Sequence, residues 1–170
     1  MANAIVVKSD IRAINIDAMN RTAKAAVDVA NGTAVTLAFS ATEGDEVFTA
    51  TVATSGMTFD IGREEDLIIA TKNMLEDEHY EGYLLEVTAG GWMAISPEVN
   101  KAVYGQTLKG LDARLFVNEA NKPFDVVKLE AGDIIQVSKD FFADRFDPKT
   151  VIGANGVELT AAGWKAIVKA

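Results

Sequence analysis

The chain has 170 residues, of which 49% are hydrophobic, so it is long enough and apolar enough for one folded domain with a buried core. Its formal net charge of -9 at pH 7 disfavours binding to nucleic acid or to an anionic membrane surface, because like charges repel. Cysteine is absent, which excludes disulfides, thiolate zinc sites and cysteine nucleophiles.

The first 30 residues follow neither the helical nor the strand period for long. Local alternation, as at Ile14 and Ile16, predicts short extended pieces. Residues 1–30 are therefore either an edge strand that starts the fold or an extended arm that packs on a neighbouring subunit, while residues 31–170 form a β-rich body. The N-terminus lacks the apolar stretch of a signal peptide, and no segment approaches the ~20 apolar residues of a membrane span. We expect a soluble protein made in the cytoplasm.

The clearest strand pair follows the turn signal Asn31-Gly32. Residues 35–39 alternate between apolar and polar or small side chains, a loop with Gly44 follows, and residues 47–52 alternate again. This pattern predicts an antiparallel hairpin with one buried face. The first strand directs three apolar side chains to that face: Val35, Leu37 and Phe39.

A helix is predicted over residues 63–76. Its acidic first turn suits the positive end of the helix dipole, and the following apolar residues share one helical face. The pair Ile68-Ile69 would also suit a strand. The acidic residues 76–81 predict a solvated loop between this element and the next strand.

Short strands and turns follow as far as residue 110. Residues 83–87 and 92–95 predict two strands, and Gly90-Gly91 between them is interpreted as a hairpin turn. Residues 98–110 predict a loop.

The stretch from residue 111 to residue 140 contains the most regular pattern of the chain. It predicts strands at residues 113–117, 124–129 and 134–137. Residues 130–133 predict a tight turn, in which Gly132 accepts a positive φ that a side chain resists.

The C-terminal part predicts core anchors, a hairpin and a last apolar element. Phe141, Phe142 and Phe146 are the expected anchors. Residues 151–152 and 157–159 flank an Asn-Gly turn signal and predict a hairpin. The last apolar element, at residues 164–168, is predicted as a strand, with a helix as the alternative. Together these elements predict a mainly β fold, a β-sandwich or barrel-like structure with one or two short helices and an extended N-terminal arm.

The sequence contains no recognisable catalytic constellation. His79 is the only histidine, and its acidic neighbours indicate an exposed charged loop rather than a catalytic base or a zinc site. The acidic clusters lack the spacing of an EF-hand, although a weak surface cation site stays open. Trp92 and Trp164 are expected in the core or at a subunit interface, with a ligand-stacking surface as the alternative. We expect no enzymatic activity, no catalytic residue, no metal site and no cofactor.

Three stretches carry a resemblance to a known family. They are the hairpin from Asn31 to Ala50, the segment Met93 to Val99, and the strand-turn-strand run from Phe116 to Val137. In this order and spacing they resemble the head decoration, or capsid-associated, structural proteins of tailed bacteriophages.

The resemblance implies a virion structural protein on the outside of a phage head, made in the host cytoplasm. Such a protein is expected to be a homotrimer that binds the major capsid protein and stabilises its lattice, with no nucleic-acid or membrane partner. The alternatives are a tail-tube or other tail subunit, whose acidic inner surface would fit the net charge, and a carbohydrate-binding β-domain. Seven apolar residues are candidates for the oligomer or capsid interface: Ile5, Val7, Ile11, Ile14, Ile16, Trp92 and Trp164.

Overall fold

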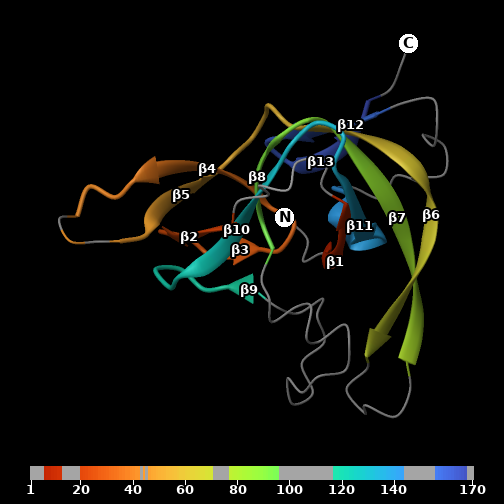
Figure 1. Cartoon of the computed structure of the whole chain (residues 1–170), viewed down its shortest axis with the longest axis horizontal. Coiled ribbons are helices and arrows are strands. Elements are labelled where there is room, and N and C mark those ends of the chain that lie inside the picture. Colours follow the sequence, from red (N-terminus) through yellow and green to blue (C-terminus); the bar gives the residue numbers. More distant parts are fainter. Residues whose placement is uncertain are drawn as a thin grey trace.

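The computed structural model describes residues 6–12, 20–42, 44, 46–70, 77–95, 117–143 and 156–167. These residues form a six-stranded sheet, a closed five-stranded barrel and a two-stranded sheet (Figure 1). The predicted mainly β fold is confirmed. Within these ranges the one helical element is the short 3-10 turn η2 (Lys139–Phe141).

The barrel joins strands from distant parts of the sequence. Four of its five contacts are antiparallel, and β2 pairs with β5 in parallel. The predicted hairpin of β4 and β5 is confirmed, with Val35 opposite Val52 and Phe39 opposite Phe48. In spatial order the strands are β10 (Phe124–Leu129), β2 (Asn20–Ala25), β5 (Phe48–Val52), β4 (Ala34–Phe39) and β8 (Gly91–Ala94).

The six-stranded sheet is antiparallel and lies beside the barrel (Figure 1). Its longest pairing is the hairpin of β6 and β7, which lies on the opposite side of the molecule from the β4–β5 hairpin. In spatial order its strands are β1 (Val6–Arg12), β11 (Ile134–Ser138), β7 (Asp77–Ala89), β6 (Thr58–Ala70), β12 (Gly156–Thr160) and β13 (Gly163–Ala166). The separate two-stranded sheet pairs β3 (Val29–Ala30) with β9 (Val117–Asn118).

The predicted helix over residues 63–76 is wrong as far as residue 70, and its last six residues lie outside the described ranges. Residues 63–70 belong to β6, and each pairs with a residue of β7, from Arg63 opposite Leu84 to Ala70 opposite Asp77. Cross-strand pairing with a long partner overrides the weak helical preference of these side chains, and the β-branched isoleucines of this segment suit the sheet. The predicted solvated loop is wrong over residues 77–81 for the same reason, because they form the start of β7.

The predicted hairpin at Gly90-Gly91 is also wrong. β7 and β8 do not pair with each other, since β7 lies in the sheet between β11 and β6, whereas β8 lies in the barrel between β4 and β10. Gly90 therefore carries the chain from the sheet into the barrel. At this crossing a Cβ atom on Gly90 would collide with the backbone carbonyl of Leu129.

The turn between β10 and β11 is confirmed. Gly132 has a φ of 96°, and the Asp133 N–H donates to the Glu130 carbonyl at 3.0 Å. The Asp133 carboxylate accepts a hydrogen bond from the Glu130 N–H at 2.8 Å. This turn fixes the angle at which the chain leaves the barrel and enters the sheet.

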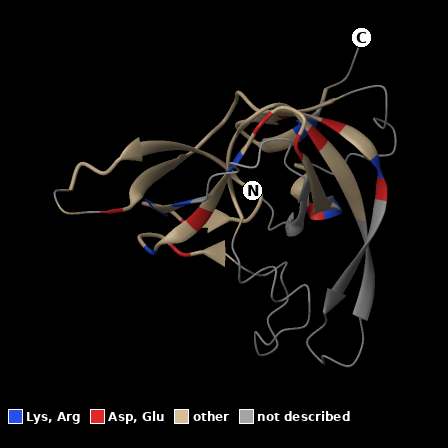
Figure 2. Cartoon of the chain, in the orientation of Figure 1, with Lys and Arg blue, Asp and Glu red and all other residues tan. Residues whose placement is uncertain are grey.

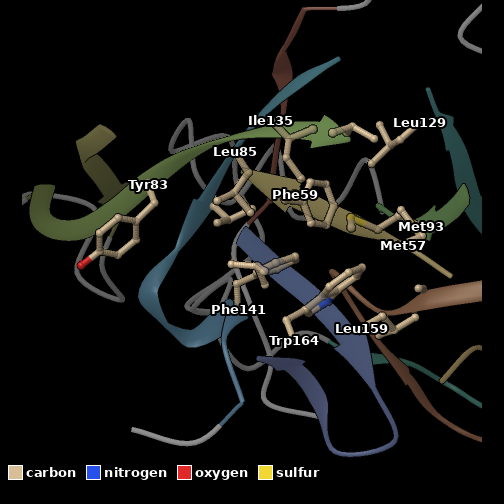
Figure 3. Close-up of a cluster of buried hydrophobic side chains, with 14 of the residues drawn as sticks. Met57, Phe59, Tyr83, Leu85, Met93, Leu129, Ile135, Phe141, Leu159 and Trp164 are labelled. Atoms are coloured by element: carbon tan, nitrogen blue, oxygen red, sulfur yellow. The ribbon is translucent and has the colours of Figure 1, made fainter. Parts of the chain in front are cut away.

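The main core lies between the sheet and the barrel. Met93 of β8 and Leu129 of β10 point from the barrel toward Phe59 and Leu85 of the sheet (Figure 3). Phe141 and Phe142 are buried in this core, as predicted, whereas Phe146 lies outside the described ranges. A second, smaller cluster fills the barrel with residues that are mostly small: Ala23, Ala25, Val29, Val35, Ala50, Ala94, Phe124 and Val126.

Candidate interface

The N-terminal segment enters the fold through two strands. β1 lies at one edge of the six-stranded sheet, where it pairs with β11, and β2 lies inside the barrel between β10 and β5. Of the candidate interface residues, Val7 and Ile11 belong to β1. Ile5, Ile14 and Ile16 lie outside the described ranges. β1 therefore has the position expected of an edge strand that starts the fold.

Trp164 belongs to the core and not to a surface. Its side chain is 1% exposed, and its ring stacks on that of Phe141 with centroids 5.0 Å apart. Its indole Nε1–H donates to the Gly32 carbonyl at 2.8 Å, which ties the C-terminal hairpin to the turn before β4. Since it is buried within its own chain, this side chain offers no contact area to a partner and no stacking face to a ligand.

Trp92 lies at the edge of the barrel cluster. It is half-buried against that cluster and lies opposite Val35 of β4 and Lys128 of β10. Of the two tryptophans, it is the one that keeps an accessible part on the surface of the chain.

The most exposed large apolar side chain among the described residues is at the end of the β4–β5 hairpin. Phe39 is 88% exposed, and its ring stacks on that of Phe48 with centroids 5.5 Å apart and an angle of 30° between the planes. Figure 1 shows why, because this hairpin extends beyond the neighbouring strands of the barrel. We call Phe39, Phe48 and the described residues between them the hairpin tip.

The exposure of Phe39 could not be read from the strand pattern alone. Val35, Leu37 and Phe39 share one face, as predicted, but burial falls along it from the buried Val35 through the half-buried Leu37 to the exposed Phe39. This face of β4 is buried only along the part that the other barrel strands cover. Alternation predicts which face a residue occupies, whereas its depth depends on where the partner strands end.

The charged residues of the β4–β5 hairpin itself are all acidic. Every charged residue in the sequence from 34 to 52 is an Asp or a Glu, and Glu46 beside Phe48 is exposed. Figure 2 shows the described part of this hairpin as uncharged except for an acidic position near its end. The hairpin thus combines an aromatic pair with acidic charges of its own, while Lys24 of the neighbouring strand β2 lies opposite Thr49.

A buried polar contact near the barrel was not predicted from the sequence. The Asn118 side-chain amide donates to the Val29 carbonyl at 3.0 Å and to the Asn31 side-chain oxygen at 3.3 Å. Nearby, the Asp28 carboxylate accepts from the Ala120 N–H at 2.8 Å. Both asparagines resemble ordinary turn residues in sequence, and only the pairing of β3 with β9 brings them together.

The described ranges contain no group of three or more His, Cys, Asp or Glu side chains that could hold a metal ion. The backbone of His79 lies in β7 opposite Ile68, and not in the predicted loop. No helix in the described part of the chain is both long and apolar enough to cross a membrane.

Among the described residues, the hairpin tip and β1, which is one of the two edge strands of the six-stranded sheet, are suited to contact a partner. One offers aromatic side chains, and the other offers the backbone of a sheet edge. Comparisons with family models, curated proteins and solved structures found no match to this chain.

Proposed function

We propose that this chain is a virion structural protein, a capsid decoration protein that binds the outside of a phage head and stabilises the lattice of the major capsid protein. The sequence support is the resemblance of three ordered stretches to that family. The confirmed β4–β5 hairpin and the β10-turn-β11 unit belong to two of these stretches.

The structural observation that carries the proposal is the position of β1 at the edge of the six-stranded sheet. An edge strand presents a row of backbone N–H and C=O groups that a strand of another chain can join. Strand addition of this kind derives its affinity from main-chain hydrogen bonds. Repeated over the many equivalent positions of a shell, such contacts gain strength through multivalency.

The test is binding of the purified chain to empty shells of the major capsid protein from the same genome. We expect saturable co-sedimentation, with a fixed ratio of chain to capsid subunit, and shells that melt at a higher temperature once decorated. Light scattering of the free chain should give a homotrimer. Shells that take up no chain at any concentration, and melt unchanged, would rule the proposal out.

A tail-tube subunit is the second candidate, and the open sheet edge favours it as well. Tube subunits assemble into rings through extended strand pairing, and a net charge of -9 would line the lumen with charges that repel DNA. The two candidates differ in the assembly formed without a shell. A hexameric ring or a polymerised tube of the purified chain would favour the tail.

A further inference from the structure

We propose that the hairpin tip is a second docking element, which inserts Phe39 into an apolar socket bordered by Lys or Arg on a subunit of the capsid lattice. This inference rests on the proposed function and adds the chemistry of one contact to it. It is independent of β1, since the tip belongs to the barrel and β1 belongs to the sheet.

The exposure of Phe39 is the first observation. A phenylalanine ring that is 88% exposed leaves apolar surface in water, and burying it in a partner would be favourable. The stack on Phe48 adds a second ring to the same feature. Aromatic side chains of this kind are enriched among the residues that dominate binding at protein interfaces.

The rigidity of the hairpin is the second observation. β4 and β5 are joined by five consecutive residue pairs, from Val35–Val52 to Phe39–Phe48. β4 is also held by β8, and β5 by β2. The aromatic pair is therefore presented on a pre-formed support, so that little conformational entropy is lost when it binds.

The charge of the hairpin indicates the chemistry of the socket. Since every charged residue from 34 to 52 is acidic, a partner surface with a basic border is complementary, and an acidic border would be repelled. The same argument disfavours a second copy as the occupant. Two tips that met would bring like charges together between two chains of net charge -9.

The experiment compares four chains for binding to the shells of the previous subsection, by co-sedimentation at a series of salt concentrations. They are the wild type, Phe39→Ala, Glu46→Lys and the control Val27→Ala. Val27 is the other large apolar side chain exposed in the described ranges, at 55%, and it lies in the turn between β2 and β3, away from the tip. Circular dichroism verifies that each variant is folded, and light scattering gives its mass.

We expect Phe39→Ala to weaken binding by about 10- to 100-fold, which corresponds to the loss of one buried aromatic side chain. Val27→Ala should bind within about 2- to 3-fold of the wild type, as isolated surface substitutions do. Glu46→Lys should weaken binding and make it less sensitive to salt, because it replaces an attractive charge with a repulsive one.

Two results would overturn the inference and leave the proposed function standing. In the first, the wild type decorates the shells and Phe39→Ala binds them equally well. In the second, Phe39→Ala reduces the mass of a free oligomer, which would make a second copy the occupant. If the wild-type chain does not bind the shells at all, the proposed function is rejected, and the docking of the hairpin tip is rejected with it.

Discussion

Replacement of Trp164 should be the most damaging single change in the described core, for two separable reasons. The indole is 1% exposed and stacked on Phe141, so Trp164→Ala removes a large buried side chain, a change that costs about 3–5 kcal/mol. It also leaves the buried Gly32 carbonyl without its 2.8 Å hydrogen bond, at a further cost of about 1–3 kcal/mol. The sum is comparable to the whole stability of many domains, which is about 5–15 kcal/mol.

The variant Trp164→Phe reduces the packing cost but does not remove it. It keeps one aromatic ring in the core and removes the N–H donor together with part of the buried indole, so we expect a loss of about 2 kcal/mol, smaller than that of Trp164→Ala. For a chain of this length that loss lowers Tm by about 4–8 °C. Trp92→Phe is the matched control, because that indole is only half-buried, and its loss should stay near or below about 1 kcal/mol.

The assay is urea unfolding followed by far-ultraviolet circular dichroism, which does not depend on tryptophan fluorescence. With an unchanged m value, the midpoints should fall in the order wild type, Trp92→Phe, Trp164→Phe and Trp164→Ala. If Trp164→Ala unfolded within about 1 kcal/mol of the wild type, the indole would not be the anchor between the C-terminal hairpin and the turn before β4.

Three further predictions concern the backbone, a buried amide and the first strand. Gly90→Ala should lower the free energy of unfolding by about 3 kcal/mol or more, because the added Cβ meets a rigid backbone carbonyl of β10. Gly62→Ala is the control, since its added Cβ would lie 3.4 Å from the nearest atom, the Leu84 carbonyl oxygen, and it should lower the free energy by no more than about 1 kcal/mol in the same urea titration. Asn118→Ala should lower the free energy of unfolding by about 1–3 kcal/mol, since the buried Val29 carbonyl loses its hydrogen-bond donor. Thermal unfolding measures this loss, and an unchanged Tm would show that the hydrogen bond does not stabilise the fold. Deletion of residues 1–12 should leave a folded body, because β11 keeps its pairing with β7, but should abolish shell binding. An unfolded product on circular dichroism would show that β1 is required for the core.

Local patterns predicted those elements whose alternation and bounding turns can be recognised within a few neighbouring residues. The β4–β5 hairpin and the strand at residues 124–129 follow from alternation bounded by turn residues, and the structure has both. Gly132 was identified because a positive φ has a strong residue preference. In each case the information lies within a few neighbouring residues.

The errors arise where pairing with another strand, and not the local pattern, decides the structure. Residues 63–70 carry an acceptable helical pattern, and only the long facing strand β7 makes them a strand. Gly90-Gly91 has the composition of a hairpin turn, but composition does not say whether the next strand returns to the same sheet. The barrel itself depends on the parallel pairing of β2 with β5, which no local pattern encodes.

The interface residues proposed from the sequence stay a prediction, and the structure gives the positions of some of them. β1 was chosen because its apolar residues fit no period, and it lies at a sheet edge. Trp164 was proposed as an interface residue because it is a large aromatic residue, but its burial within its own chain excludes it from an interface. Phe39 was placed on the correct face, but the position where the barrel ends, which leaves it in water, comes only from the three-dimensional structure.

The pairing of β1 with β11 has a consequence for how a newly synthesised chain reaches its fold. β1 has its partner at residues 134–138, so its pairing cannot form until those residues have left the ribosome. The barrel closes almost as late, since β2 pairs with β10 at residues 124–129. Contacts this distant in sequence slow folding. During that interval β1 of one nascent chain can join β11 of another, so synthesis on crowded polysomes should give more strand-exchanged oligomers than refolding of the dilute protein.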